Sequence, residues 1–319
     1  MSFVRTVLGD IPPEDLGITY HHEHIISAPP RRTTGGDPDL ILDSVDRIAQ
    51  EVAAFQALGG RSICDASAID YGRDIAGVVA VARRTGAHLI ATAGFNKGLY
   101  FEPWIEGAAL DSLTERIRRE VREGIDGTPH RAGMVKFGSS YGHISPVEEK
   151  CARAVCRAQR ALGAPLFTHA EAGTMVLEQL DLLREEGVEL EQVCIGHLDR
   201  NPDLWLCRQV AKTGAFISLD QWSKVKYGPD SVRMDLLIAL VKRGLQKQIL
   251  ISGDLARRSY LRAYGGGPGY GYILGRVIPR LRDQLREEDL PPAQIEQVVA
   301  DLLVNNPRQF FTFRGRADD

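Results

Sequence analysis

Amphipathic stretches that end at a glycine and are followed by a short apolar run recur along most of this chain. They occupy residues 42–58, 73–85, 146–162, 173–186, 202–213 and 231–243. In the first stretch, Ile48, Val52 and Phe55 share one face of a helix, and Gly59 follows. Glycine readily adopts the left-handed conformation that ends a helix. The pattern therefore predicts helices that alternate with strands.

The apolar runs give eight expected strands, at residues 18–25, 61–66, 88–94, 133–138, 165–169, 193–197, 215–219 and 248–253. Alternating strands and helices indicate a parallel sheet with crossover helices. Eight such units favour a single (β/α)8 TIM barrel over residues 1–319, closed by one or two helices within 292–313. A doubly wound open sheet is the alternative, but it usually has a glycine-rich turn after its first strand. Here the first strand ends in HHEH.

Composition excludes several classes of protein. Of the 319 residues, 44% are hydrophobic and 25% are charged, which is typical of globular proteins. A formal net charge of -3 argues against binding to nucleic acid or to an anionic membrane. No apolar run approaches the ~18 residues of a membrane span, and MSFVRTVLGD does not resemble a secretory signal. Five cysteines without a CxxC motif indicate reduced thiols, so we expect a cytoplasmic protein.

Four histidines and an aspartate lie at the expected C-terminal ends of strands. His22 and His24 end the first strand, and residues i and i+2 of a strand point to the same side. His169, His197 and Asp254 end three other strands. Active sites of such barrels lie at this face, and imidazole and carboxylate are the usual ligands of zinc and related metals. The five residues together predict a metal site.

Lys136 is expected at the same mouth, where a metal would repel a cationic amine. By itself, this residue would be interpreted as a lysine at a strand end that extends to solvent. A buried amine can instead lose its proton and then add carbon dioxide. The resulting carbamate could bridge two metals, whereas five ligands alone suit one five-coordinate ion.

The motifs HHEH, VKFG, FTHA, IGHLDR and SGD, in this order, resemble the phosphotriesterase family of the amidohydrolase superfamily. The resemblance extends to NNPRQFF near the end of the chain and implies a barrel with two divalent metals. By this resemblance, His22, His24 and Asp254 hold the more buried metal, His169 and His197 hold the more exposed one, and Lys136 bridges them as N6-carboxylysine. Zinc is the expected metal, and manganese or cobalt suits the same ligands.

The resemblance also implies hydrolysis by a metal-bridging hydroxide that attacks a carbonyl or phosphoryl centre. Asp254 would take the proton and deliver it to the leaving oxygen. Asp199, in IGHLDR, is a candidate for orienting groups or relaying protons. It could equally be the N-cap of the helix that follows it.

Cations in the long loops indicate an anionic substrate. Lys97 follows the third strand, Lys224 and Lys226 follow the seventh, and Arg257 and Tyr260 follow the eighth. Arginine and lysine suit a phosphate or a carboxylate. The long loops at 95–111 and 255–275 interrupt the regular alternation, and GDLARRSY and YGGGPGYGYI resemble the branch of the family that opens phosphorylated sugar lactones. Lys226, Arg257 and Tyr260 would then bind the phosphate.

The sequence leaves three alternative functions open. One is a phosphotriesterase or phosphate-ester hydrolase, and another is an acyl-homoserine lactonase of the same family. The segment Gly94–Phe95–Asn96–Lys97 disfavours the second, because such lactonases tend to have a tyrosine after the third strand. The third is a non-catalytic ligand-binding barrel, which would normally lack a ligand position. We also expect a homodimer that acts on a small molecule.

Overall fold

The computed structural model describes residues 2–314. Eight parallel strands form one sheet in the order β3 to β10, each paired with its neighbour in sequence. The strands are β3 (Ile18–Glu23), β4 (Gly60–Asp65), β5 (His88–Gly94), β6 (Met134–Ser139), β7 (Leu166–Ala170), β8 (Val193–Ile195), β9 (Phe216–Leu219) and β10 (Ile249–Ile251). All eight expected strands are confirmed to within a few residues.

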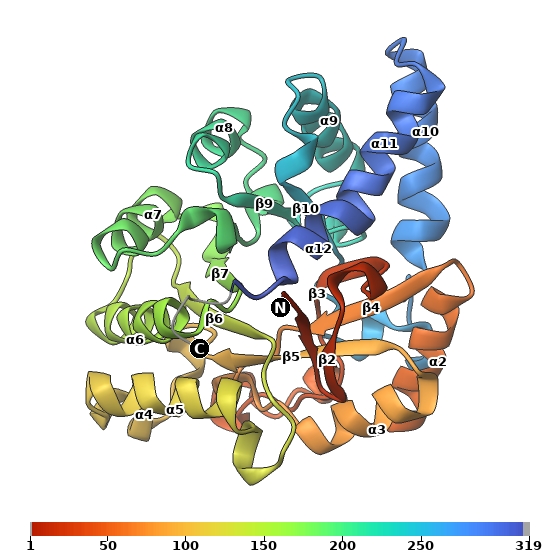
Figure 1. Ribbon diagram of the computed structural model, residues 1–319. Coiled ribbons are helices and arrows are strands. Elements are labelled where there is room, and N and C mark those ends of the chain that lie inside the picture. Colours follow the sequence, from red (N-terminus) through yellow and green to blue (C-terminus); the bar gives the residue numbers. More distant parts are fainter. Residues whose placement is uncertain (1, 315–319) are drawn as a thin grey trace.

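The two edges of the sheet meet, so the sheet is nearly closed into a barrel. The backbone N–H of Asp254, just after β10, donates to the carbonyl of His22 in β3 over 3.0 Å. Figure 1 shows the strands around a common centre, with the helices outside them. The expected (β/α)8 TIM barrel is confirmed.

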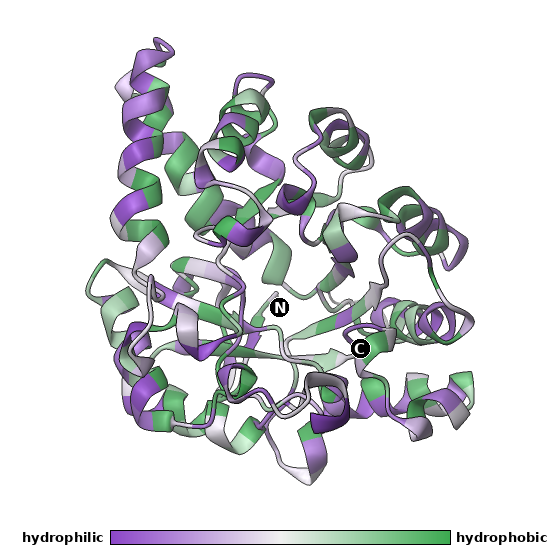
Figure 2. Cartoon of the chain, turned by 180° about the vertical axis from the view of Figure 1, so that it is seen from behind, coloured by the Kyte–Doolittle hydropathy of each residue, from purple (hydrophilic) through white to green (hydrophobic). Residues whose placement is uncertain are grey.

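The helices that the glycine pattern predicts are present. They are α2 (Val45–Gln56), α3 (Ile75–Thr85), α6 (Pro146–Leu162), α7 (Val176–Glu185), α8 (Leu204–Lys212) and α9 (Asp230–Val241). Gly86 and Gly163 end two of them with φ of 68° and 64°, the left-handed geometry expected there. Figure 2 shows the helices coloured on both sides of the hydropathy scale, as expected for helices with one face on the barrel.

Several elements were not anticipated from the sequence. A short hairpin of β1 (Val4–Thr6) and β2 (Gly9–Ile11) precedes the barrel, and α1 (Arg31–Thr34) follows β3. The long connection after β5 contains α4 (Pro103–Gly107), which α5 (Leu110–Arg122) follows. Near the end of the chain, α10 (Ile278–Glu287) precedes α11 (Pro292–Ala300) and α12 (Asn306–Phe311), the last two being the expected closing helices.

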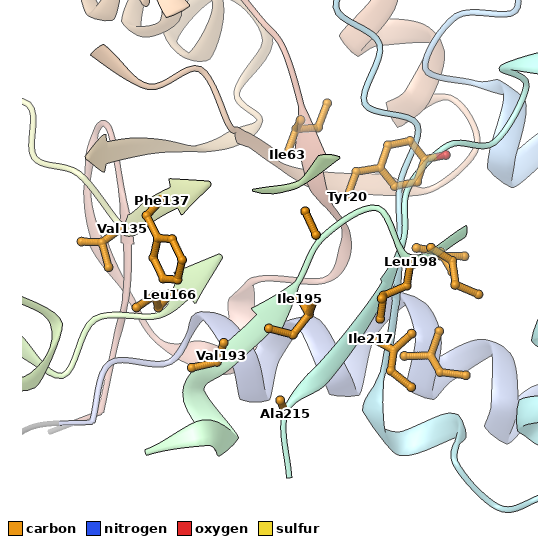
Figure 3. Close-up of a cluster of buried hydrophobic side chains, with 14 of the residues drawn as sticks. Tyr20, Ile63, Val135, Phe137, Leu166, Val193, Ile195, Leu198, Ala215 and Ile217 are labelled. Carbon is orange, nitrogen blue, oxygen red and sulfur yellow. The ribbon is translucent and has the colours of Figure 1, made fainter. Parts of the chain in front are cut away.

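The alternation of side chains along the strands produces two buried layers. Val135 and Phe137 of β6 belong to the large core between the strands and the helices, which Figure 3 shows with residues of neighbouring strands. Met134 instead belongs to a separate cluster with Phe167, Phe216 and other residues of neighbouring strands. Lys136 is two residues beyond Met134 and therefore lies on the same side of β6.

No helix within residues 2–314 is long and apolar enough to cross a membrane. The five cysteines are all free and buried. This agrees with the reduced thiols expected from their number and spacing.

Candidate metal centre and substrate pocket

His22, His24 and Asp254 form one group of converging ligand atoms. His22 lies in β3, His24 follows that strand, and Asp254 follows β10. The Oδ1 atom of Asp254 is 3.4 Å from Nε2 of His22 and 3.1 Å from Nε2 of His24. These three residues could hold a metal ion, because their ligand atoms lie within 4.8 Å of one another.

His169 and His197 form a second group beside the first. His169 is in β7 and His197 follows β8, and Nδ1 of His169 lies 2.7 Å from Nε2 of His197. The rings of His22 and His197 have centroids 5.2 Å apart, so the two groups are neighbours. The structure thus brings together the four histidines and the aspartate that were predicted as ligands.

In each histidine, the ring nitrogen that faces away from this centre has a hydrogen-bond partner. Nδ1 of His22 and Nδ1 of His197 are 2.9 and 2.8 Å from the carboxylate of Asp220. Nδ1 of His24 is 2.8 Å from the hydroxyl of Ser67, and Nε2 of His169 is 2.8 Å from Glu171. Such partners fix the tautomer and orientation of metal-binding histidines. The donor set, and the way it is anchored, therefore fit divalent metals.

Burial and neighbouring charges keep these groups in the protonation states that metal binding requires. It lowers the pKa of His22 to about 3 and that of His169 well below its usual value. Burial alone would raise the pKa of Asp254, but Lys224 and His22 outweigh it and hold this pKa well below its usual range. Neutral imidazoles and an ionised carboxylate are competent ligands.

Lys136 extends from β6 into the same centre. Its side chain is buried, and Nζ donates to the carbonyl of Ala66 over 3.0 Å and lies 5.6 Å from the centroid of the Phe167 ring. Burial lowers the pKa of Lys136, so the amine is more easily neutral than an exposed one. A lysine that extends to solvent is excluded here, whereas carboxylation of Lys136 stays a prediction.

The backbone at two of the predicted ligands has an uncommon conformation. His197 has a φ of 61° and Asp254 a φ of 49°, in the left-handed region that residues other than glycine seldom adopt. Such conformations concentrate at functional sites, where the surrounding structure holds them. The surroundings thus impose the directions in which these two side chains point.

A pocket of about 130 Å³ opens over this centre. Its lining includes the predicted metal ligands and Lys136, and nearly all its other residues carry polar or charged groups. Leu40 and Ala256 are its aliphatic members. The pocket also contains the four residues that were predicted to bind substrate: Lys97, Lys226, Arg257 and Tyr260.

Five cations line this pocket besides Lys136, and we refer to them as the mouth cations: Lys97, Arg200, Lys224, Lys226 and Arg257. Four of them are paired with carboxylates. Lys97 and Arg200 contact Glu171, the latter at 2.7 Å, and Lys224 is 2.5 Å from Asp254. Arg257 is 3.1 Å from both Asp37 and Asp39.

Lys226 differs from the other mouth cations, because it has no carboxylate partner among the described residues. Its Nζ lies 4.7 Å from the centroid of the Tyr227 ring and 5.6 Å from that of Tyr260. Burial lowers the pKa of Lys226, but hydrogen bonding to Tyr260 and Tyr227 raises it above its usual value overall. Lys226 is therefore a cation that is free to meet an anionic group.

Asp199 is not a helix N-cap, so that interpretation is wrong. Asp203 caps α8, accepting from the N–H groups of Trp205 and Leu206. Asp199 is buried and accepts from the backbone of Gln221 over 2.8 Å, with Arg233 at 3.3 Å. It therefore supports the segment that contains Asp220.

Sequence reasoning missed the residues that hold the ligands in place. Asp220 directly follows β9 and has no motif beyond its position at a strand end. Glu171 is two residues after His169 in the sequence HAE. The position of Asp220 at a strand end, as for Asp254, was the one signal that could have found it.

A model of the phosphotriesterase family matches residues 2–311. The chain belongs to this family. The phosphotriesterase homology protein of Escherichia coli K12 is 34% identical over 299 residues, which cover 92% of this chain and 98% of that protein. A phospho-furanose lactonase of Mycoplasmopsis synoviae is 31% identical over 339 residues, covering 98% of this chain and 92% of that protein.

Solved structures agree with this assignment. The lactonase from Listeria monocytogenes superposes with a TM-score of 0.94 at 43% identity, covering 98% of this chain and 100% of that one. The Escherichia coli phosphotriesterase homology protein, solved with phosphate in its active site, gives a TM-score of 0.86 at 34% identity, with 93% and 99% covered. The family resemblance and the enzyme class, a hydrolase, are confirmed.

Proposed function

We propose that this protein is a binuclear metal-dependent lactonase that opens a phosphorylated sugar lactone. The observation that carries the proposal is one small polar pocket in which anchored metal ligands face the free cation Lys226. The relatives named phospho-furanose lactonase and lactonase support the same reaction class.

The two histidine groups would hold one metal each. His22, His24 and Asp254 would bind the first, while His169 and His197 would bind the second. Lys136 would bridge them as N6-carboxylysine, and zinc is the metal that we expect. When bound, such metals supply an activated water and polarise the carbonyl of the substrate.

The protein's own residues would orient the site and move the proton. Asp220 holds the rings of His22 and His197 through their Nδ1 atoms, which keeps their Nε2 atoms directed at the centre. Asp254 is ionised and lines the pocket, so it could accept a proton and deliver it to the ring oxygen of the opening lactone. Lys224, 2.5 Å from Oδ2 of Asp254, holds that carboxylate in place.

The size and lining of the pocket favour this substrate over the alternatives. A volume of about 130 Å³ is well below the ~300–1,000 Å³ typical of pockets for drug-sized ligands. It suits a compact polar molecule and disfavours a long acyl chain or the bulky apolar groups of an aryl triester. The almost wholly polar lining likewise suits the hydroxyls of a sugar.

Lys226, Tyr260 and Arg257 would bind the phosphate of the substrate. Both cations line the pocket, and Asp37 and Asp39 fix the direction of Arg257 while leaving it donors in excess of those two contacts. The Escherichia coli relative was solved with phosphate in its active site, which supports an anion site in a pocket of this kind.

Proton release from a panel of compounds would test the reaction class. Sugar lactones, acyl-homoserine lactones and phosphate esters should be compared on metal-loaded protein, with a His169→Asn variant as the metal-deficient control. We expect turnover of sugar lactones that is lost in the variant. Turnover of phosphate esters alone would refute the proposal, as would a variant that lacks metal yet keeps the wild-type rate.

A further inference from the structure

Glu171 connects three side chains on one wall of the pocket. It lies in the turn after β7, and its Oε2 contacts Nε2 of His169 at 2.8 Å and the amine of Lys97. Its Oε1 contacts Arg200 at 2.7 Å. One carboxylate therefore takes up the ionic contacts of two mouth cations, and both of these cations come from other segments of the barrel.

The two sides of the mouth consequently differ in their capacity for an anion. Lys97 and Arg200 already face a negative charge, whereas Lys226 faces the rings of Tyr227 and Tyr260. Both environments border the Tyr227 ring, because the guanidinium of Arg200 is 4.2 Å from its centroid and the amine of Lys226 is 4.7 Å from it. Of these three cations, Lys226 is therefore the one that has no carboxylate partner among the described residues and can pair with a phosphate.

We propose that Glu171 determines the orientation of the substrate by pairing with Lys97 and Arg200, so that neither cation can bind a phosphate. We call this effect masking. With both cations masked, the phosphate of the substrate binds beside Lys226, and the lactone carbonyl is left at the metal centre. Without the mask, a second anion site opens next to His169, and the substrate can bind in a reversed, unproductive orientation. This inference rests on the proposed function for the identity of the substrate, and on the contacts of Glu171 for the mask itself.

A Glu171→Gln variant tests the mask, since it keeps the shape of the side chain and an acceptor oxygen for His169 while removing the charge. Binding of inorganic phosphate to the protein as purified, measured by calorimetry, should become about ten- to a hundredfold tighter or show an additional site. This corresponds to one charge-assisted hydrogen bond from the unmasked cations to the phosphate. Adding Lys97→Met or Arg200→Met to the variant should reverse the increase in affinity.

Steady-state kinetics give an independent readout. Loss of the charge that holds His169 should lower kcat/KM by the same factor for both lactones. Unproductive binding lowers kcat and KM together, so the phosphorylated lactone should show an additional decrease of both parameters that its unphosphorylated twin does not show. If kcat and KM change equally for the two lactones, Glu171 only holds His169, and that result would overturn the proposal.

Glu178→Gln is the matched control, because Glu178 is an exposed residue of the neighbouring helix α7. It should leave phosphate binding unchanged. If Glu171→Gln does not fold, Lys97→Met alone replaces it, and masking predicts that phosphate binding falls by less than about twofold. Unchanged phosphate binding in a folded Glu171→Gln variant refutes the mask. Because calorimetry needs no turnover, a failure of the lactonase proposal would appear separately, as absent ring opening in the wild-type protein.

Discussion

Replacing Lys226 by methionine removes the one mouth cation that has no carboxylate partner within residues 2–314, and it keeps most of the side chain's volume. A hydrogen bond to a charged group contributes about 1.5–3 kcal/mol, and about 1.4 kcal/mol corresponds to a factor of ten in rate. Lys226 is exposed at the mouth, so solvent screening should reduce its contribution to the lower end of this range of free energies. We therefore expect kcat/KM for a phosphorylated lactone to fall about tenfold.

The assay compares one sugar lactone with and without its phosphate, on wild-type protein and on Lys226→Met. The unphosphorylated lactone should be turned over equally well by both proteins, because the metal centre is unchanged. The preference of the wild type should also weaken as salt is raised, since Lys226 is exposed. Equal losses for both lactones, or no loss for either, would refute the assignment of Lys226 to the phosphate.

Other consequences of the structure can be measured separately. Lys136→Ala should lose metal, measured as metal content per chain, and a short carboxylic acid added with metal should partly restore activity. Asp220→Asn should weaken metal affinity about 10–100-fold in a chelator competition, with circular dichroism unchanged, because the amide cannot accept from both rings. Arg257→Ala should reduce the preference for the phosphorylated lactone and leave its neutral twin nearly unaffected. Metal-free protein should become less stable to urea as the pH falls below 6.5. Burial lowers the pKa of His21 to about 4 and that of His22 to about 3, so both residues bind protons more readily in the unfolded chain. A free energy of unfolding that stays constant down to pH 4 would contradict these low pKa values.

The fold could be predicted because short stretches of sequence indicate where its helices and strands begin and end. Glycines such as Gly86 and Gly163 mark the ends of helices, and short apolar runs mark buried parallel strands. Elements that lack a recognisable pattern of apolar residues could not be predicted from the sequence. The hairpin of β1 and β2 has strands of three residues each, too short for an alternating pattern to be recognised.

The residues proposed as metal ligands could be selected from the sequence for a similar reason, since they end strands whose positions the pattern defines. The pairing of the mouth cations was not. Arg257 meets Asp37 and Asp39, more than two hundred residues earlier in the chain, and the position of Lys97 beside Glu171 depends on how two loops fold over the barrel. Only the three-dimensional structure distinguishes the free Lys226 from its paired neighbours.

The other expectations depend on the proposed opening of a phosphorylated sugar lactone at a metal centre. Its most direct test is the ratio of kcat/KM for a phosphorylated furanose lactone to that for its unphosphorylated twin, on wild-type protein loaded with metal. We expect a ratio of about ten or more, with all turnover lost when a chelator removes the metal. A ratio near one, or turnover that survives metal removal, would contradict it.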